Sequence, residues 1–324
     1  MYRRFLMVTT LMLALILSAC GQSTGQTDTT GSPAASAAPE VSSAPAASGS
    51  PSGSVAPAAT SAAAGGEQAM EMAPEGSALR AIQDRGKLIA GVKYDVPLFG
   101  FLNPTTNKVE GFDVEIAREV AKKIFGNPDA IEFKEAISKN RIPYLADGTV
   151  DIVVSTMTAN AERAEQINFS DTYYVAGQSL LVKKGSDVQS IDNLSGKVVA
   201  TVKGSTSETN IRAKAPQATV ELYDTYADAV QALQSGRADA VTTDDIILYG
   251  FQSQNTEQLE VVGGQFTKEP YAIGIKKDST ELTEVVNATL REIKENGRWA
   301  EIYKQFIPEQ EVPAIPPQDW REVK

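Results

Sequence analysis

A nine-residue pattern occurs twice in this chain, 88 residues apart, and it constrains the fold more than any other feature. The first copy is residues 145–153 (LADGTVDIV) and the second is residues 233–241 (LQSGRADAV). Both read as a helix end, a glycine and then a buried strand. Such junctions look alike in every α/β protein, so coincidence is one interpretation. The other is a chain of two α/β lobes of similar build.

The rest of the sequence from Ala78 onward alternates between strand and helix patterns. Ligands of open α/β sheets bind at the carboxyl ends of the strands, so we expect a site after Val154 and after Val241, facing one another across a cleft. Apolar or β-branched runs predict strands at 87–92, 131–134, 150–156, 177–183, 197–202, 238–243 and 271–275. Helices are predicted at 138–146, 225–234, 279–295 and 298–306, and another starts at Asp113 as N-cap and ends at Gly126.

Cys20, the only cysteine, closes a segment that has the composition of an export signal. Arg3 and Arg4 precede an apolar run, residues 5–17, that is shorter than the roughly 20 residues of a membrane-spanning helix. Residues 17–20 (LSAC) resemble the lipobox of bacterial lipoproteins, in which the cysteine is lipidated; an ordinary signal peptide is the alternative. We expect residues 1–20 to be a lipoprotein signal peptide. Lipid on Cys20 would anchor the protein on the outer face of the cytoplasmic membrane.

Residues 21–77 consist mainly of Ser, Ala, Pro, Gly and Thr, with no aromatic residue. Such a segment buries too little apolar surface to offset its chain entropy, so we predict a disordered tether. The folded part is then residues 78–324.

Composition excludes several kinds of site. The chain has no histidine and a single cysteine, which rules out intrachain disulfides, Cys/His metal sites and Ser-His-Asp triads. Its 30 basic and 41 acidic residues give a net charge of −11, which argues against a nucleic-acid partner. We expect neither a metal nor another cofactor.

Several charged and hydroxyl side chains stand at the ends of predicted elements. Lys93 follows the first strand, Arg141 lies in a short helix, and Arg163 follows the strand end that holds Thr156 and Thr158. A lone surface cation is most often only solvated. The set as a whole nevertheless suits an α-amino acid, because arginine can bond both oxygens of a carboxylate.

The second lobe adds complementary groups. Thr206 lies in a Gly-Ser-Thr turn that opens a helix, where free N–H groups favour an anion. Asp244 ends a predicted strand and offers a carboxylate for an ammonium group; it is equally the start of a helix.

Six segments occur in a telling order: residues 111–117 (GFDVEIA), 151–158 (DIVVSTMT), 162–163 (ER), 168–174 (NFSDTYY), 203–206 (KGST) and 271–275 (YAIGI). Together they resemble the type II (family 3) extracellular solute-binding proteins of ABC amino-acid importers. The resemblance implies a two-lobed periplasmic-binding-protein-like type II fold of the α/β class, with a hinge between lobes. Lobe 1 would be residues 78–176 and 270–324, and lobe 2 residues 177–269.

The resemblance also implies residue roles. Arg163 would grip the α-carboxylate, helped by the N–H groups of Thr158 and Thr206. Asp244 would hold the α-ammonium, helped by the Thr158 hydroxyl and the Thr156 carbonyl.

The side-chain pocket resembles that of the glutamate/aspartate-binding branch. Lys93 stands where relatives for basic amino acids tend to be acidic, Arg141 lies on the same side of the cleft, and Tyr226 matches a further binding position. Burying a ligand carboxylate is costly unless it is paired, and these cations would pair it. Phe99 is either a pocket wall or a core residue.

We therefore expect a monomeric, non-enzymatic receptor that closes around glutamate, or aspartate, and delivers it to an ABC transporter permease. Its other partner would be the membrane, through the lipid. A ligand sensor for a signalling receptor and a dehydratase-type enzyme on the same fold are the alternatives.

Overall fold

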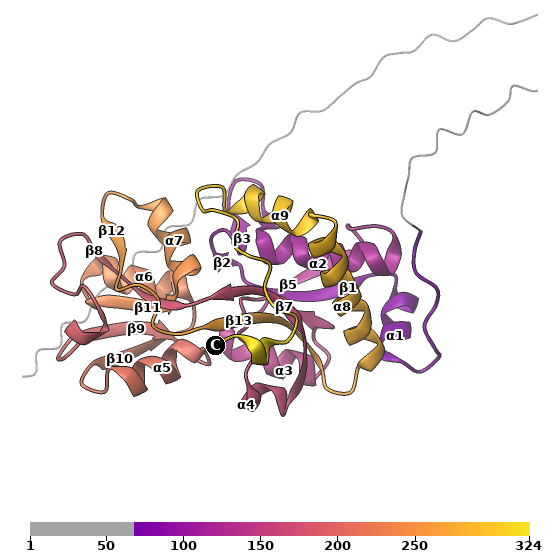
Figure 1. The fold of residues 1–324 in the computed structure, drawn as a ribbon, viewed down its shortest axis with the longest axis horizontal. Coiled ribbons are helices and arrows are strands. Elements are labelled where there is room, and N and C mark those ends of the chain that lie inside the picture. Colours follow the sequence, from indigo (N-terminus) through magenta and orange to yellow (C-terminus); the bar gives the residue numbers. More distant parts are fainter. Residues whose placement is uncertain (1–67) are drawn as a thin grey trace, which may run out of the picture. The chain divides into compact units, whose positions relative to one another are not determined.

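The computed structural model describes residues 68–324, in which a small three-stranded antiparallel sheet, residues 95–110, accompanies two mixed five-stranded sheets flanked by helices (Figure 1). We call the five-stranded sheets with their flanking helices lobe 1 and lobe 2. The predicted signal peptide, Cys20 and most of the predicted tether lie outside these residues. Nowhere in 68–324 is there a helix with the length and apolar character to cross a membrane.

Lobe 1 is built on a sheet in the order β5-β1-β6-β13-β7. β5, β1 and β6 are parallel, and β13 runs antiparallel to both β6 and β7. α2, α8 and α9 pack on one another, and α3 packs on β6 and β13. The elements are α1 (Ala78–Arg85), β1 (Leu88–Val92), β2 (Asp95–Val96), β3 (Gly100–Asn103), β4 (Lys108–Glu110), α2 (Phe112–Phe125), β5 (Ile131–Glu135), η1 (Ser138–Asn140), α3 (Arg141–Ala146), β6 (Ile152–Val153), α4 (Ala161–Ala164), β7 (Ile167–Ala176), β13 (Glu269–Lys276), α8 (Thr280–Glu295), α9 (Arg298–Phe306) and η3 (Trp320–Glu322).

Lobe 2 repeats this plan with a sheet in the order β10-β9-β11-β8-β12. β10, β9 and β11 are parallel, and β8 is antiparallel to β11. β12 is antiparallel to β8, as β7 is to β13, so the strand directions match those of lobe 1 position by position through all five strands. The elements are β8 (Gln178–Lys183), η2 (Ile191–Asn193), β9 (Val198–Val202), α5 (Thr206–Lys214), β10 (Thr219–Tyr223), α6 (Tyr226–Ser235), β11 (Ala240–Asp244), α7 (Asp245–Gln254) and β12 (Leu259–Val262).

The two copies of the sequence pattern occupy equivalent places in the two sheets. Gly148 and Gly236 both adopt positive φ, at 76° and 79°, directly before the third strand of each sheet. The aspartates of the pattern also match, because Asp151 accepts the N–H of Ile89 and Asp239 accepts that of Val198. The repeat thus reflects two α/β units of similar build, as the second interpretation predicted.

Two extended segments connect the lobes. β7 of lobe 1 ends at Ala176 and β8 of lobe 2 begins at Gln178, with Gly177 between them. The returning strand β13 begins at Glu269, which pairs with Ala176, so β7 and β13 run side by side where the lobes join (Figure 1).

Three details differ from the sequence predictions. Asp113 is not an N-cap: Gly111 takes that position, and Asp113 lies buried inside the first turn of α2. The strand predicted at 150–156 is confined to Ile152–Val153. The tether also ends before residue 77, because the side chain of Gln83 bonds the N–H of Ala73 and the carbonyl of Glu71.

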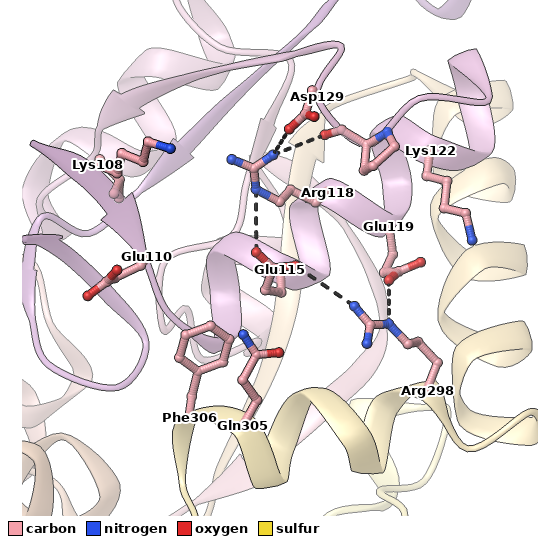
Figure 2. Close-up of a pocket in the computed structure, with 12 residues that line it drawn as sticks. Lys108, Glu110, Glu115, Arg118, Glu119, Lys122, Asp129, Arg298, Gln305 and Phe306 are labelled. Atoms are coloured by element: carbon pink, nitrogen blue, oxygen red, sulfur yellow. Dashed lines mark hydrogen bonds and ion pairs between the residues drawn. The ribbon is translucent and has the colours of Figure 1, made fainter. Parts of the chain in front are cut away.

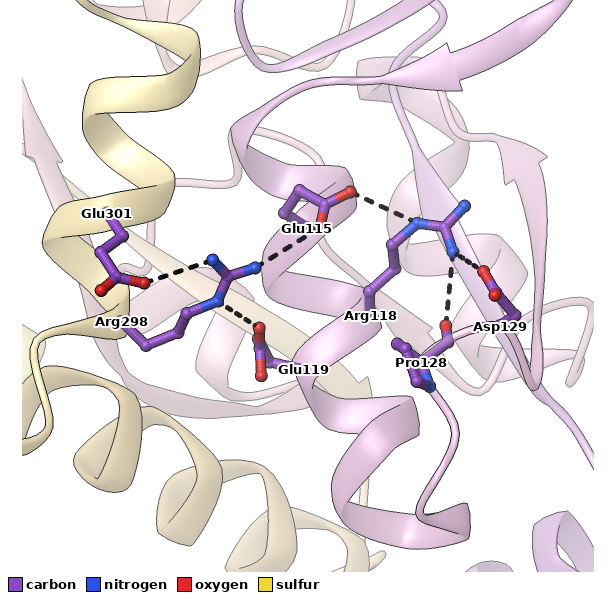
Figure 3. A network of polar contacts seen from close by, with 7 residues as sticks. All are labelled: Glu115, Arg118, Glu119, Pro128, Asp129, Arg298 and Glu301. Atoms are coloured by element: carbon purple, nitrogen blue, oxygen red, sulfur yellow. Dashed lines mark hydrogen bonds and ion pairs between the residues drawn. The ribbon is translucent and has the colours of Figure 1, made fainter. Parts of the chain in front are cut away.

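The contact between α2 and α9 carries a charged network on the outside of lobe 1. Arg298 on α9 contacts Glu119 at 2.7 Å and Glu115 at 3.9 Å, and Glu115 also contacts Arg118 (Figure 3). These residues line a cavity of about 600 Å³ (Figure 2). Both arginines already pair with carboxylates, so we do not expect them to bind an anion in this cavity.

Candidate ligand-binding site

The eight ligand-binding residues predicted from the sequence all lie near the carboxyl ends of parallel strands or at the helix starts beside them. All except Thr206 are buried, and Thr206 is half-buried. Lobe 1 contributes Lys93, Arg141, Thr156, Thr158 and Arg163, and lobe 2 contributes Thr206, Tyr226 and Asp244.

Arg163 reaches from lobe 1 to lobe 2. Its Nη1 donates to the carbonyl of Thr158 at 2.7 Å, and its Nη2 donates to the carbonyl of Gly204 at 3.1 Å. Gly204 has a φ of 74° and lies against Lys139, where a Cβ would come within 2.9 Å of the Lys139 Cα. The two lobes are therefore in close contact at this edge of the cleft.

Arg141 lies beside Arg163 and is held by carbonyl oxygens. Its Nη1 donates to Ser155 at 2.9 Å and to Thr156 at 3.1 Å. The Thr156 carbonyl, which the family resemblance assigned to an ammonium, is thus occupied by this guanidinium. Arg141 and Arg163 both line a cavity of about 250 Å³ at the mouth of the cleft.

Lys93 is fully enclosed between the lobes. Its Nζ donates to Oγ of Ser138 at 2.9 Å and lies 5.7 Å from the ring centroid of Tyr226. Within residues 68–324, no ion pair joins a carboxylate to Lys93, Arg141 or Arg163. Three buried cations therefore share the cleft with only neutral hydrogen-bond partners.

Burial sets the charge behaviour of these cations. It lowers the pKa of Lys93 to about 7, and repulsion from Arg141 contributes further. It lowers the pKa of Arg163 to about 9, again with a contribution from Arg141. A ligand carboxylate beside them would favour their charged forms.

Asp244 provides a carboxylate at the end of β11. Its Oδ2 accepts a 2.5 Å hydrogen bond from the hydroxyl of Tyr271, whereas its buried Oδ1 has no partner among the described residues. Burial raises the pKa of Asp244 well above its usual value, and repulsion from Glu269 adds to the rise. A buried acceptor without a donor is costly, and an ammonium group would satisfy it.

Glu269 is a cleft residue that sequence reasoning missed. Its Oε2 accepts from the hydroxyls of Thr158 at 2.7 Å and Thr206 at 2.8 Å, and its Oε1 accepts from Asn210. The available signal was a carboxylate at the point where the chain was predicted to return between lobes.

Asp113 is a second missed residue. Its carboxylate accepts the N–H of Thr156 and the hydroxyl of Tyr173, both at 2.8 Å. Thr156 has a φ of 43°, so Asp113 anchors a strained residue of the cleft loop. Burial raises the pKa of Asp113 to about 7.

Phe99 behaves as a core residue. It is fully buried and packs edge-on against Phe112 and Tyr174, with ring centroids 5.5 Å apart in both pairs. It also contacts Tyr271, through which it supports Asp244.

The cleft brings donors and acceptors together from both lobes. Arginine and lysine side chains supply the donors, and Asp244 with two threonine hydroxyls supplies acceptors. In the part of the chain that the structure describes, no group of three or more His, Cys, Asp or Glu side chains is placed to hold a metal ion.

Comparison with known proteins identifies related chains. The family described as "Bacterial extracellular solute-binding proteins, family 3" matches residues 88–309. The "ABC transporter glutamine-binding protein GlnH" of Bacillus subtilis is 47% identical over 250 residues, covering 77% of this chain and 90% of that protein. The "Glutamate-binding protein GluB" of Corynebacterium efficiens is 35% identical over 246 residues, covering 72% and 82%.

A solved structure gives the same result for the fold. "An ancestral arginine-binding protein bound to glutamine" superposes with a TM-score of 0.65 at 38% identity and covers 69% of this chain and 98% of that one. The predicted two-lobed fold of the α/β class is confirmed.

Proposed function

The chain belongs to the bacterial extracellular solute-binding proteins of family 3, and we propose that it is an amino-acid receptor that captures glutamate between its lobes for an ABC transporter permease. The α-carboxylate would bind Arg163 and the N–H groups of Thr158 and Thr206. The α-ammonium would bind Asp244, whose Oδ1 has no other donor among residues 68–324.

The observation that supports an acidic ligand is the pair Lys93 and Arg141. Both are buried, and their hydrogen-bond partners are a hydroxyl and carbonyl oxygens rather than carboxylates. An anionic side chain placed between them would gain charge-assisted hydrogen bonds. It would also offset the cost of keeping two like charges close together out of water.

Glutamine is the second candidate, and the 47% identity to a glutamine-binding protein favours it. Its amide oxygen has the reach of a glutamate oxygen and accepts from the same donors. It brings no charge to Lys93 and Arg141, however, and its NH₂ group needs acceptors of its own. Aspartate is shorter by one methylene, a difference worth only about 1 kcal/mol.

Isothermal titration of the purified protein with glutamate, glutamine and aspartate tests this proposal. We expect glutamate to bind most tightly in the wild type. Lys93→Gln should lower the affinity for glutamate at least tenfold and the affinity for glutamine much less. Lys139→Gln is the matched control, because this exposed lysine at the cleft edge pairs with Asp224 and should not alter the ratio. Tighter binding of glutamine than of glutamate by the wild type would establish the second candidate.

Lipid anchoring at Cys20 is a further part of the proposal. A Cys20→Ala protein should keep its ligand affinity but appear in the medium instead of the membrane fraction. Retention of this variant on membranes would contradict the anchor.

Import, rather than sensing, is what we propose for the bound ligand. Uptake of radiolabelled glutamate should fall when the protein is deleted and return with the wild-type gene. Unchanged uptake together with a lost transcriptional response would favour the sensor. We propose no catalytic activity; turnover of a bound carboxylic acid would contradict that.

A further inference from the structure

We propose that Glu269 is a positioning residue that accepts hydrogen bonds from the hydroxyls of Thr158 and Thr206, so that both hydroxyl oxygens face a ligand only as hydrogen-bond acceptors. The inference rests on the proposed function insofar as the cleft holds an α-amino acid. It assigns selection at the α-position to a residue that need not touch the ligand.

The geometry around Glu269 determines the direction of both hydrogen bonds. One oxygen of its carboxylate, Oε2, lies 2.7 Å from Oγ1 of Thr158 in lobe 1 and 2.8 Å from Oγ1 of Thr206 in lobe 2. An ionised carboxylate can only accept, and a hydroxyl has one proton to give. Each threonine hydroxyl therefore donates its single hydrogen bond to Glu269.

The surroundings of Glu269 keep this arrangement in place. Its side chain is only 2% exposed, and Nδ2 of Asn210 donates to its other oxygen at 3.1 Å. Glu269 also begins the strand that returns from lobe 2 to lobe 1. One carboxylate thus lies between hydroxyls of both lobes at the point where the chain crosses between them.

The consequence is an acceptor-only surface in the cleft. The two hydroxyl oxygens lie 3.5 Å apart with no proton left to share, and Nε2 of Gln178 donates to that of Thr206 at 3.3 Å. The backbone of Thr158 forms an isolated β-bridge with Tyr271, whose hydroxyl donates to Asp244. Thr158, Thr206 and Oδ1 of Asp244 together match the three N–H donors of an ammonium group.

Such a surface discriminates at the α-position of a ligand. A 2-amino acid brings donors to the acceptors. A 2-oxo acid of the same length brings only a carbonyl oxygen, which leaves acceptors facing an acceptor. If Glu269 only connected the two lobes, its loss would lower the affinity for both ligands by the same factor.

The test is the Glu269→Gln variant, titrated with the amino acid that the wild type binds and, by competition, with its 2-oxo analogue. The pairs are glutamate with 2-oxoglutarate, or glutamine with 2-oxoglutaramate. The glutamine amide donates to one threonine, which frees that hydroxyl to donate to the ligand. We expect the amino acid to lose about tenfold in affinity, as for one hydrogen bond to a charged group, and the 2-oxo acid to gain.

The matched control is Glu260→Gln on β12, which exchanges a half-buried carboxylate outside the cleft that accepts a hydrogen bond from the N–H of Gly185. Its ratio of affinities should equal that of the wild type. Equal losses for both ligands in Glu269→Gln, an unchanged amino-acid affinity, or a 2-oxo acid that still fails to compete would each overturn the inference.

The same experiment separates this inference from the proposed ligand. A wild type that binds another amino acid contradicts glutamate and glutamine alone, and the variant is then measured with that amino acid and its 2-oxo analogue. A wild type that binds no amino acid contradicts both proposals.

Discussion

Asp95 of lobe 1 accepts a 2.8 Å hydrogen bond from the backbone N–H of Tyr226, the first residue of helix α6 in lobe 2. The N–H of Ala227 points to the same oxygen at 3.4 Å. A carboxylate at a helix N-terminus is favoured by the free N–H groups and the helix dipole. This contact therefore stabilises the closed arrangement of the lobes.

Asp95→Ala should shift the unliganded protein toward an open form and lower the binding affinity for every ligand. The loss of a charge-assisted hydrogen bond of about 1.5 kcal/mol corresponds to roughly tenfold in affinity. Small-angle scattering of the unliganded protein and calorimetric titration measure the two effects. Asp95→Asn keeps an acceptor oxygen and should lose less; equal losses in the two variants would attribute the effect to charge alone.

The next prediction concerns Arg163 and the binding of the ligand's α-carboxylate. Its guanidinium bonds carbonyls of both lobes, and a ligand carboxylate would be a further, charged partner. Arg163→Gln should reduce amino-acid affinity at least about thirtyfold, since removing one partner of a buried charge pair costs about 2–5 kcal/mol.

Arg163→Lys is the informative companion variant. It keeps the charge but not the planar fork, so we expect an intermediate loss. Thermal melting of both unliganded variants checks that the fold is intact. Wild-type affinity in Arg163→Gln would remove this residue from the binding site.

The pH dependence of affinity separates glutamate from glutamine. Lys93 has a pKa near 7 in the unliganded protein, so it is charged below that pH and neutral above it. A ligand carboxylate favours the charged form and raises this pKa in the complex. Asp113 also has a pKa near 7, so it becomes an anion as pH rises and then repels the ligand carboxylate.

Lys93 and Asp113 give the same sign, whereas Asp244 gives the opposite sign for any amino acid, because its pKa is raised well above the usual value and a bound ammonium favours its ionised form. Because Asp244 acts on both ligands alike, the ratio of glutamate affinity to glutamine affinity should be highest below pH 7 and fall above it, by at most about tenfold per pH unit for each linked proton. Titrations in buffers of different ionisation enthalpy should show more proton uptake at pH 8 with glutamate than with glutamine. A pH-independent ratio of the two affinities would contradict the role of Lys93.

Local sequence patterns predicted those parts of the fold that local physics determines. Helix α9 was predicted with its observed bounds, Arg298–Phe306, because an amphipathic pattern begins directly after Gly297. Gly126 ends α2 in the left-handed conformation, as glycine at that position predicts. The cleft residues at strand ends were found because the topology of open sheets places them there.

The errors share a different cause. Asp113 was interpreted as a helix cap because only its neighbours in sequence were considered. Its actual partners, Thr156 and Tyr173, are 43 and 60 residues away. Gly111 takes the cap, with a φ of 139° and no room for a Cβ beside the carbonyl of Phe99.

Glu269 escaped notice for the same reason. It acts on threonines that lie 111 and 63 residues away, and no periodic pattern links such distant positions. The strand at 150–156 was overestimated because its β-branched run continues past Val153. At Thr156 the backbone turns to positive φ and leaves the sheet.

Gly250 offers a way to test lobe closure without disturbing either lobe. It lies inside helix α7, where a Cβ would come within 2.8 Å of the Pro97 carbonyl of lobe 1. Gly250→Ala should favour the helix by about 0.5–1 kcal/mol, because alanine loses less conformational entropy there. The same methyl group should obstruct closure, because the Pro97 backbone must move to make room for it.

We therefore expect Gly250→Ala to lose about tenfold in affinity for every ligand while the unliganded protein melts no lower than the wild type. Calorimetric titration and thermal melting give the two values. Gln254→Ala, an exposed position on the same helix, should change neither. A variant that binds as tightly as the wild type would show that α7 and Pro97 separate in the ligand-bound form, and closure would then depend on the contacts of Asp95 and Gly204.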